Sequence, residues 1–319
     1  MKGLELSKLY YEAYGKAMLG EFPQLEPFIA VGVAGPGSEC LGFDDDVSSD
    51  HDFEPGFCIF IPGEDIVSRR DEFLLQRAYD KLPKDFMGYS RSIMIPAGGR
   101  RRGVLRIDEF YERCTGTGSF VFGTDPAKGP ENPLSTGQWL SLPEEYLLEA
   151  TNGEVFFDSF GRFSAIRAYL SDMPEDVRLK KLAGALMMMS QSGIYNYPRC
   201  LAHGEKAAAQ LAVYGFAERA VHAAYLLNRR YMPYYKWWFR GMRELPALGK
   251  LSDTLEDMIL DPSGDQSSRI KTVSEEIAGE LLRFGLSDVE GNSLEKHAQN
   301  VNGRISDTYL RSADMLIAE

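Results

Sequence analysis

The sequence predicts an α+β protein in which a mixed β-sheet with flanking helices is followed by an all-helical region. Two observations lead to this prediction. In the first half, short apolar runs at residues 28–34 and 57–61 are bounded by glycine and proline, which is typical of buried strands. From Asp172 onward, apolar residues instead recur at helical spacing. We expect two domains, at residues 1–165 and 166–319.

Composition narrows the class of protein. The chain has 319 residues, 44% hydrophobic and 26% charged, as in an ordinary globular protein long enough for two domains. Its net charge of −12 argues against a nucleic-acid partner, because phosphate contacts need clustered Lys and Arg. We expect reduced thiols because the cysteines are widely spaced. We expect a cytoplasmic location and no membrane partner because the N-terminus lacks a signal-peptide pattern and no 18-residue apolar run occurs.

Local signals place the elements of the first half in order. Residues 4–20 and 67–82 have helical spacing, and Pro83 follows the second of these helices. A hairpin is expected at 91–107, followed by a short helix at 109–114 with Asp108 as its N-cap. We then expect a loop at 115–139, a helix at 142–150 and a strand at 154–158.

The second half is expected to be a helical bundle. Asp172 is the expected N-cap of a first helix that ends at Gly193. The next helix, at about 202–228, is apolar over most of its surface and is therefore expected at the centre. Further helices are expected at about 233–245, 250–260, 266–284 and 294–317.

Two motifs in residues 28–61 carry chemistry. Gly37 and Ser38 end the first apolar run in a turn whose backbone amides can bind phosphate. Asp50 and Asp52 precede the second run and, two apart on a strand, would point to one face about 6–7 Å apart. Such a pair suits a hard divalent cation, so the sequence predicts a site for Mg²⁺ and a phosphate chain. Residues 44–46 are expected to be a solvated acidic loop.

These residues resemble a known signature. In order, they are Gly37-Ser38, Gly42 and Ser49-Asp50-His51-Asp52-Phe53. The pattern is similar to that of the DNA polymerase β-type nucleotidyltransferases, although the gap before Asp50 is about one residue longer than in that signature. The segments at 153–158 and 227–237 add a resemblance to the DUF4037 branch of that superfamily, and the likeness covers most of residues 25–245.

The resemblance implies a nucleotidyltransferase fold and a role for each residue. Gly37 and Ser38 would hold the β- and γ-phosphates of an NTP. Asp50 and Asp52 would be catalytic and would hold the Mg²⁺ cofactor. A third acid is required, and Asp158, at the end of an expected strand, fits better than Asp108. The alternative for Asp158 is that it only opens a turn.

Two basic segments have alternative interpretations. Lys236 stands among aromatic residues at 231–238, where it could bind the triphosphate while Tyr231, Tyr234 or Tyr235 lines a nucleotide or acceptor pocket. Alternatively, the tryptophans pack in the bundle and Lys236 extends to solvent. The arginines at 100–102 could bind an anion, or they could form a solvated turn.

The leading functional prediction is Mg²⁺-dependent transfer of an NMP, with AMP as the first choice, from an NTP to a hydroxyl or amine. By analogy with the superfamily, the acceptor would be a small molecule such as an antibiotic, bound by the helical domain. One alternative is a nucleotide-binding regulatory protein with weak catalysis. Another is a toxin-like enzyme that modifies tRNA or protein.

Overall fold

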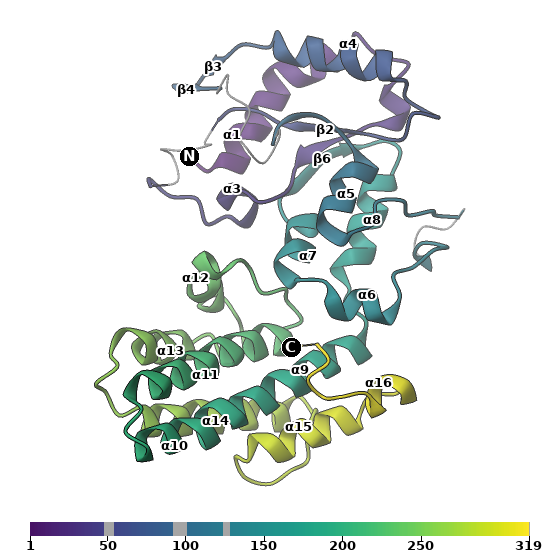
Figure 1. Ribbon diagram of the computed structural model, residues 1–319. Coiled ribbons are helices and arrows are strands. Elements are labelled where there is room, and N and C mark those ends of the chain that lie inside the picture. The colour runs from purple at the N-terminus through teal and green to yellow at the C-terminus, as the bar shows by residue number, and fades with distance from the viewer. Residues whose placement is uncertain (48–53, 92–100, 124–127, 319) are drawn as a thin grey trace. The chain divides into compact units, whose positions relative to one another are not determined.

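The computed structural model describes residues 1–47, 54–91, 101–123 and 128–318. These residues form a mixed four-stranded sheet with flanking helices, and a helical region follows (Figure 1). The predicted fold class is confirmed.

The sheet has the strand order β5-β2-β1-β6. β1 is antiparallel to β2 and to β6, whereas β2 and β5 are parallel. Every residue of β1 and β2 is buried, because both strands are apolar on both faces. The strands are β1 (Ala30–Val33), β2 (Cys58–Ile61), β5 (Gly103–Arg106) and β6 (Glu154–Asp158). Three of them confirm the strands predicted at 28–34, 57–61 and 154–158.

The predicted hairpin at 91–107 is described only in part. Its first strand, at residues 92–95, and Arg100 lie outside the described residues, and β5 is its second strand. A small hairpin that the sequence did not predict joins β3 (Asp85–Phe86) to β4 (Tyr89–Ser90). Its two turn residues, Met87 and Gly88, have φ of 51° and 86°, as a tight turn between antiparallel strands requires.

The helices in the first half of the chain flank the sheet (Figure 1). Aromatic side chains from these helices pack on the strands, with Tyr11 and Tyr79 each meeting Phe57 edge-on at centroid distances of 5.3 and 5.1 Å. The helices are α1 (Gly3–Tyr10), a π-turn at Tyr11–Gly15, α2 (Lys16–Leu19), α4 (Arg69–Asp80), α5 (Ile107–Thr115), α7 (Glu144–Thr151) and α8 (Arg162–Ser171). The helices predicted at 4–20, 67–82, 109–114 and 142–150 are confirmed. α8 was not predicted.

Asp108 does not cap α5, so the predicted capping role is wrong. The helix begins at Ile107, and the residue before it is Arg106. Asp108 lies in the first turn, where its carboxylate forms an ion pair of 2.7 Å with Arg162 at the start of α8.

The chain divides into two compact units. Unit 1 comprises residues 1–133 and 146–172, and unit 2 comprises residues 134–145 and 173–319. The sheet belongs to unit 1, and unit 2 is helical. The assignment of residues 1–165 to catalysis and 166–319 to substrate binding stays a prediction.

Unit 2 is built around α9 and α11, which pack against each other. α9 begins after Pro174, so the predicted N-cap at Asp172 is wrong. The predicted stop at Gly193 is also wrong, because a π-helical stretch continues through it into α10. Gly193 is required for packing instead, since a Cβ there would lie 2.4 Å from the Phe216 ring. The elements are α6 (Thr136–Ser141), α9 (Glu175–Met189), π-helix Ser190–Asn196, α10 (Tyr197–Ala202) and α11 (Lys206–Leu227).

Among the remaining helices of unit 2, two differ from the prediction and two agree with it. The helix expected at 233–245 is a 3₁₀ turn at Tyr235–Trp237 followed by α12 (Trp238–Met242). The helix expected at 294–317 is two, α15 (Leu294–Gly303) and α16 (Thr308–Ser312), because Asp307 caps a new start by accepting from Leu310 N at 3.0 Å. The helices predicted at 250–260 and 266–284 are confirmed as α13 (Leu251–Leu260) and α14 (Gln266–Arg283).

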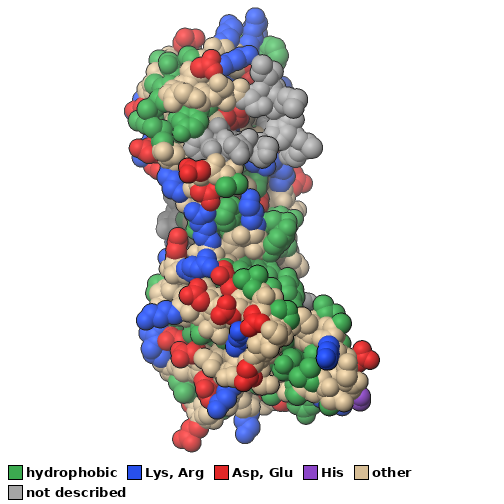
Figure 2. Space-filling view, turned by 90° about the vertical axis from the view of Figure 1, so that its left-hand side faces the viewer, with side chains coloured by type: hydrophobic (Ala, Val, Ile, Leu, Met, Phe, Trp, Pro, Cys, Tyr) green, Lys and Arg blue, Asp and Glu red, His purple; other side chains and the backbone are tan. Residues whose placement is uncertain are grey.

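Across the described ranges, no helix combines the length and the apolar character needed to cross a membrane. On the face shown in Figure 2, described Lys and Arg side chains are interspersed with Asp and Glu and form no single continuous basic patch. Whether the protein binds nucleic acid stays untested.

Candidate functional site

The sheet register gathers four strand ends at one edge, which we call the turn edge. Gly32 near the end of β1 pairs with Cys58 at the start of β2, and Cys58 pairs with Gly103 at the start of β5. Val33 pairs with Glu154 at the start of β6. The segment after β1 and the segments that lead into β2, β5 and β6 therefore meet at this edge.

The Gly-Ser turn lies on the turn edge. Gly37 and Ser38 follow β1, and Ser38 begins the short helix α3 (Ser38–Leu41). In α3 the amide of Cys40 donates to Gly37 O at 3.0 Å, and the amides of Ser38 and Glu39, which precede it, have no acceptor within the helix. The helix ends at Gly42, whose φ of 74° suits glycine.

Asp50 and Asp52 lie outside the described residues, as does His51. The chain resumes at Glu54 and enters β2 at the turn edge. The predicted pairing of the two aspartates on one strand face is therefore not tested. Their position in the chain places them shortly before the strand start that pairs beside the Gly-Ser turn. The described residues contain no cluster of three or more His, Cys, Asp or Glu side chains that could hold a metal.

Asn152 stabilises the backbone of the turn through two hydrogen bonds to Gly35. Its Oδ1 accepts from Gly35 N at 2.9 Å, and its Nδ2 donates to Gly35 O at 2.8 Å. Asn152 is 8% exposed, and Gly35 has a φ of 115° that only glycine adopts readily. One amide side chain thus satisfies both polar groups of a buried glycine in the turn.

The next residue completes this support. Gly153 N donates to Cys40 O in α3 at 2.9 Å. A Cβ at Gly153 would lie 1.9 Å from Val33 O, so glycine is required for the close approach of the two segments. Arg167 of α8 donates to the carbonyl oxygens of Asn152 and, at 3.1 Å, Gly153. The turn before β6 therefore fixes the position of the Gly-Ser turn.

A buried ion pair lies beside the Gly-Ser turn. Arg102, the residue before β5, pairs through Nη2 with Oε1 of Glu39 in α3. The two side chains are 9% and 13% exposed. A Cβ at Gly37 would lie 2.2 Å from both carboxylate oxygens of Glu39, so that carboxylate rests against the glycine of the turn. The interpretation of Arg102 as part of a solvated turn is wrong.

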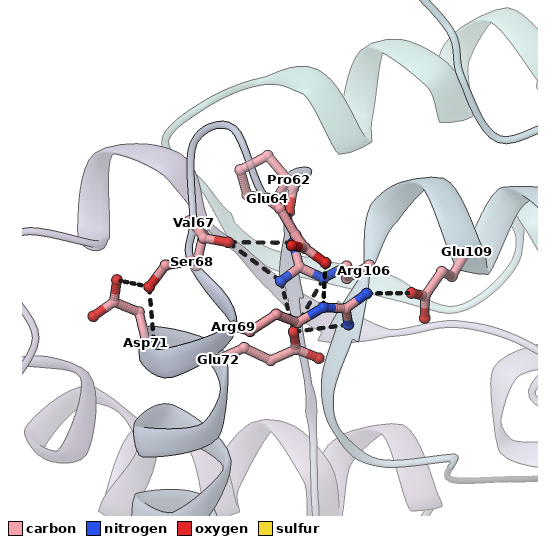
Figure 3. Close-up of polar contacts among 9 residues, drawn as sticks. All are labelled: Pro62, Glu64, Val67, Ser68, Arg69, Asp71, Glu72, Arg106 and Glu109. Carbon is pink, nitrogen blue, oxygen red and sulfur yellow. Dashed lines mark hydrogen bonds and ion pairs between the residues drawn. The ribbon is translucent and has the colours of Figure 1, made fainter.

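A second buried arginine, Arg106, pairs with Ile61 at the end of β2 and therefore lies at the opposite edge of the sheet. Figure 3 shows its polar contacts. Its Nε and Nη2 donate to Glu72 at 3.0 and 2.6 Å. Its Nη1 donates to Pro62 O at 2.8 Å, and both terminal nitrogens reach Val67 O. Every nitrogen of this guanidinium is bonded, as expected of a structural arginine that fastens β5 to α4.

Asp158 lies at the opposite edge from the Gly-Ser turn, because it pairs with Ala30 at the start of β1. Its two carboxylate oxygens accept from Gly161 N and Ser164 N, each at 2.8 Å, at the start of α8. Asp108 lies just after β5 and is also at this edge. The role of Asp158 as the third acid stays a prediction, and the observed contacts are those of a helix cap.

Asp44 is buried, so the prediction of a solvated loop is wrong for this residue. Its Oδ2 accepts from Gly3 N at 2.7 Å, and Lys2 lies 3.4 Å from Oδ1. This carboxylate attaches the start of α1 to the loop after α3.

The thiols near the turn edge are not poised as nucleophiles. Burial raises the pKa of Cys40 to about 12, and the nearby Glu39 charge adds to the rise. Cys58 is fully buried, and burial raises the pKa of its thiol as well. Both cysteines are free thiols.

Unit 2 contains a cavity of about 420 Å³ with a buried charge cluster in its wall. Glu144 accepts from His222 Nε2 at 2.8 Å and from Met232 N at 3.1 Å, and Lys181 lies 3.9 Å away. Burial acts to raise the pKa of Glu144, but His222, Lys181 and the Met232 amide outweigh it, so the pKa is lowered. Glu144 therefore remains ionised inside the wall.

Aromatic side chains form another part of the cavity wall. Tyr234 and Tyr235 lie with ring centroids 4.3 Å apart and are 50% and 62% exposed. The Trp238 indole donates to Pro233 O at 2.9 Å. Tyr234 and Tyr235 line this cavity and Tyr231 does not, and a role of these tyrosines in binding a nucleotide or an acceptor stays a prediction.

Lys236 is exposed, and its ammonium lies 4.9 Å from the centroid of the Trp237 ring. The lysine belongs to unit 2 and the Gly-Ser turn to unit 1. Contact between Lys236 and a bound triphosphate stays a prediction.

Sequence reasoning missed Asn152, and it missed the pairing of Glu39 with Arg102. An asparagine before a glycine at the end of a helix is an ordinary C-terminal signal, so nothing local marked Asn152 as a partner of Gly35. Only the basic run at residues 100–102 drew attention to Arg102.

Residues 139–238 match the family model DUF4037, a domain of unknown function. The match contains both segments, at 153–158 and 227–237, that suggested this family. The chain is similar to the solved structure of a nucleotidyltransferase-like protein from Exiguobacterium sibiricum 255-15, at 9% identity and a TM-score of 0.36. That likeness covers 92% of this chain and 79% of the other, and a TM-score this low supports no inference about activity. No curated protein matches the sequence.

Proposed function

We propose that this chain, whose residues 139–238 match the DUF4037 family model, is a Mg²⁺-dependent nucleotidyltransferase. It would transfer an NMP, with AMP as the first choice, from an NTP to a hydroxyl or amine of a small molecule. The observation that carries the proposal is the sheet register. The antiparallel pairing of Gly32 with Cys58 brings the Gly-Ser turn to the same edge as residues 54–57, which lead into β2 and follow Asp50 and Asp52 in the sequence.

The turn supports phosphate binding through its backbone. Gly37 has no side chain, so a phosphate oxygen can approach the first amides of α3 closely. Asn152 and Gly153 fix the turn in position before any ligand binds. A prearranged set of amides costs little ordering free energy when the phosphate chain binds.

The carboxylates of Asp50 and Asp52 fit Mg²⁺ in chemistry, because this ion takes oxygen ligands and commonly one or two carboxylates alongside phosphate oxygens. Bound there, Mg²⁺ would neutralise charge on the phosphates and on the leaving group. In the transfer, the acceptor oxygen or nitrogen bonds to the α-phosphorus as the bond to the bridging oxygen breaks. Pyrophosphate leaves, and the acceptor proton passes to a base or to water.

We propose that the acceptor is a small molecule bound by the cavity of unit 2. Its volume of about 420 Å³ lies in the range of small-molecule sites. Exposed faces of Tyr234 and Tyr235 offer stacking surface, while Lys181, Arg219, Glu144 and Glu145 supply charges of both signs. This mixture favours an acceptor with a ring and polar substituents over a purely cationic one.

A second candidate is a nucleotide-binding regulatory protein with weak catalysis, and one observation favours it. Asp158, the predicted third acid, pairs with Ala30, roughly 10 Å along β1 from the turn edge at about 3.3 Å per residue. A site without a third carboxylate could bind NTP–Mg²⁺ yet transfer slowly.

Incubation with each α-labelled NTP, Mg²⁺ and a metabolite extract separates these candidates. A transferase forms a labelled adduct whose mass exceeds that of the acceptor by one NMP, and the adduct disappears with Asp50→Asn/Asp52→Asn. Saturable NTP binding without any adduct would favour the regulatory protein. Absence of NTP binding would reject both.

A further inference from the structure

We propose that Arg102 binds the phosphate chain, and that the carboxylate of Glu39 occupies the phosphate position when no ligand is bound. The inference rests on the proposed function for the identity of its ligand, the polyphosphate of an NTP. It adds a binding residue at the turn edge and a built-in competitor for that residue.

The arginine is placed for this role by the sheet. Arg102 directly precedes β5, whose first residue Gly103 pairs with Cys58 at the turn edge. The stem of Arg102 packs beside Gly56, where a Cβ would lie 3.3 Å from Cγ of the arginine. Arg102 therefore lies beside the chain that leads into β2, next to the Gly-Ser turn.

The hydrogen bonds of Arg102 are incomplete. Nη1 donates to Arg101 O at 3.0 Å and Nη2 pairs with Glu39, but the buried Nε has no hydrogen-bond partner among the residues that the structure describes. An unsatisfied buried donor on a charged group is costly, commonly about 1–3 kcal/mol or more. A buried guanidinium with a spare donor suits an oxyanion that can accept from two nitrogens at once.

Arg106, the last residue of β5, is a purely structural arginine with which Arg102, just before the strand, can be compared. It is also almost fully buried and also paired with a glutamate, Glu72. All three of its nitrogens are bonded: Nε donates to Glu72, Nη1 to two backbone carbonyls, and Nη2 to both Glu72 and a backbone carbonyl (Figure 3). Arg102 thus differs from Arg106 in having one nitrogen without a partner among the described residues.

Glu39 has the position that an anionic ligand would take. Its carboxylate rests against Gly37 and simultaneously pairs with Arg102. A phosphate entering this place must displace the carboxylate, so Glu39 should weaken phosphate binding.

The test is calorimetric titration of inorganic tripolyphosphate in EDTA, which isolates Arg102 from any metal site. Glu39→Gln keeps an acceptor for Arg102 and removes the competing charge, so we expect about tenfold tighter binding than wild type, or about 1.4 kcal/mol. Glu39→Gln/Arg102→Gln, which removes both buried charges together, should lose this gain and bind more weakly than Glu39→Gln. Glu72→Gln is the matched control and should bind like wild type.

Each outcome decides the inference. Unchanged or weaker binding in Glu39→Gln would overturn it, as would equal gains in Glu72→Gln.

The same variants titrated with MgATP separate the inference from the proposed function. If MgATP binding depends on Asp50 and Asp52 but is indifferent to Glu39 and Arg102, the function stands and the inference falls. If tripolyphosphate follows the expected order while MgATP binding ignores Asp50 and Asp52, the inference stands and the function falls. No binding of either ligand rejects both.

Discussion

Replacing Asn152 tests whether the turn edge is held in place by a single side chain. Asn152→Ala removes the two hydrogen bonds of 2.9 and 2.8 Å to Gly35 and leaves both polar groups of that residue unpaired. Each unpaired buried group costs about 1–3 kcal/mol, and water entering the space left by the side chain would offset part of this. We therefore expect unit 1 to lose about 2–4 kcal/mol of unfolding free energy.

Thermal unfolding followed by circular dichroism measures this loss. For a unit of this size, 1 kcal/mol shifts Tm by about 2–4 °C, so the transition of unit 1 should fall by roughly 5–15 °C. Asn132→Ala is the matched control, because Asn132 also bonds two backbone groups, Val121 N at 2.8 Å and Ser119 O, but is exposed. We expect a shift of less than about 3 °C there. A Tm for Asn152→Ala equal to that of the control would refute the reasoning.

Two further substitutions test other parts of the account. Asp158→Asn leaves one acceptor for the amides of Gly161 and Ser164. We therefore expect a Tm about 2–4 °C lower and an unchanged affinity for MgATP. Loss of transfer activity at unchanged affinity would support the role of Asp158 as the third acid. The pKa of Glu144 is lowered from 4.5, so its charge stabilises unit 2 above that pH, and this stability is lost as pH falls through the lowered pKa. The Tm of unit 2 should therefore fall in acid more steeply in wild type than in Glu144→Gln, with Glu145→Gln as control; parallel pH profiles in all three proteins would contradict this.

Local patterns were sufficient to predict the main elements. The apolar runs at 28–34 and 57–61 can be buried only as strands covered on both faces, and they appear as β1 and β2. The predicted helix ends were wrong where contacts with other parts of the fold determine them. Gly193 has the appearance of a stop signal, but its lack of a side chain serves the Phe216 ring of α11. A pattern within one segment does not contain that information.

For the candidate site too, the sequence predicted the local motif but not the distant residues that support it. The Gly-Ser turn was identified from adjacent residues, whereas its support comes from partners far along the chain. Asn152 is 117 residues from Gly35, and Arg102 is 63 residues from Glu39. Likewise, Asp44 was expected in solvent because its neighbours are acidic, yet it binds Gly3, 41 residues away. Such contacts follow from the sheet register, which one sequence does not specify.

The central claim is that an NTP and a divalent cation bind together at the turn edge. Calorimetric titration of ATP into the wild-type chain and into Asp50→Asn/Asp52→Asn, each with Mg²⁺ and with EDTA, tests it most directly. The account predicts saturable binding to the wild type with Mg²⁺, and a loss of at least about tenfold in affinity both in EDTA and in the double variant. Equal affinity in all four titrations, or no binding in any of them, would contradict it.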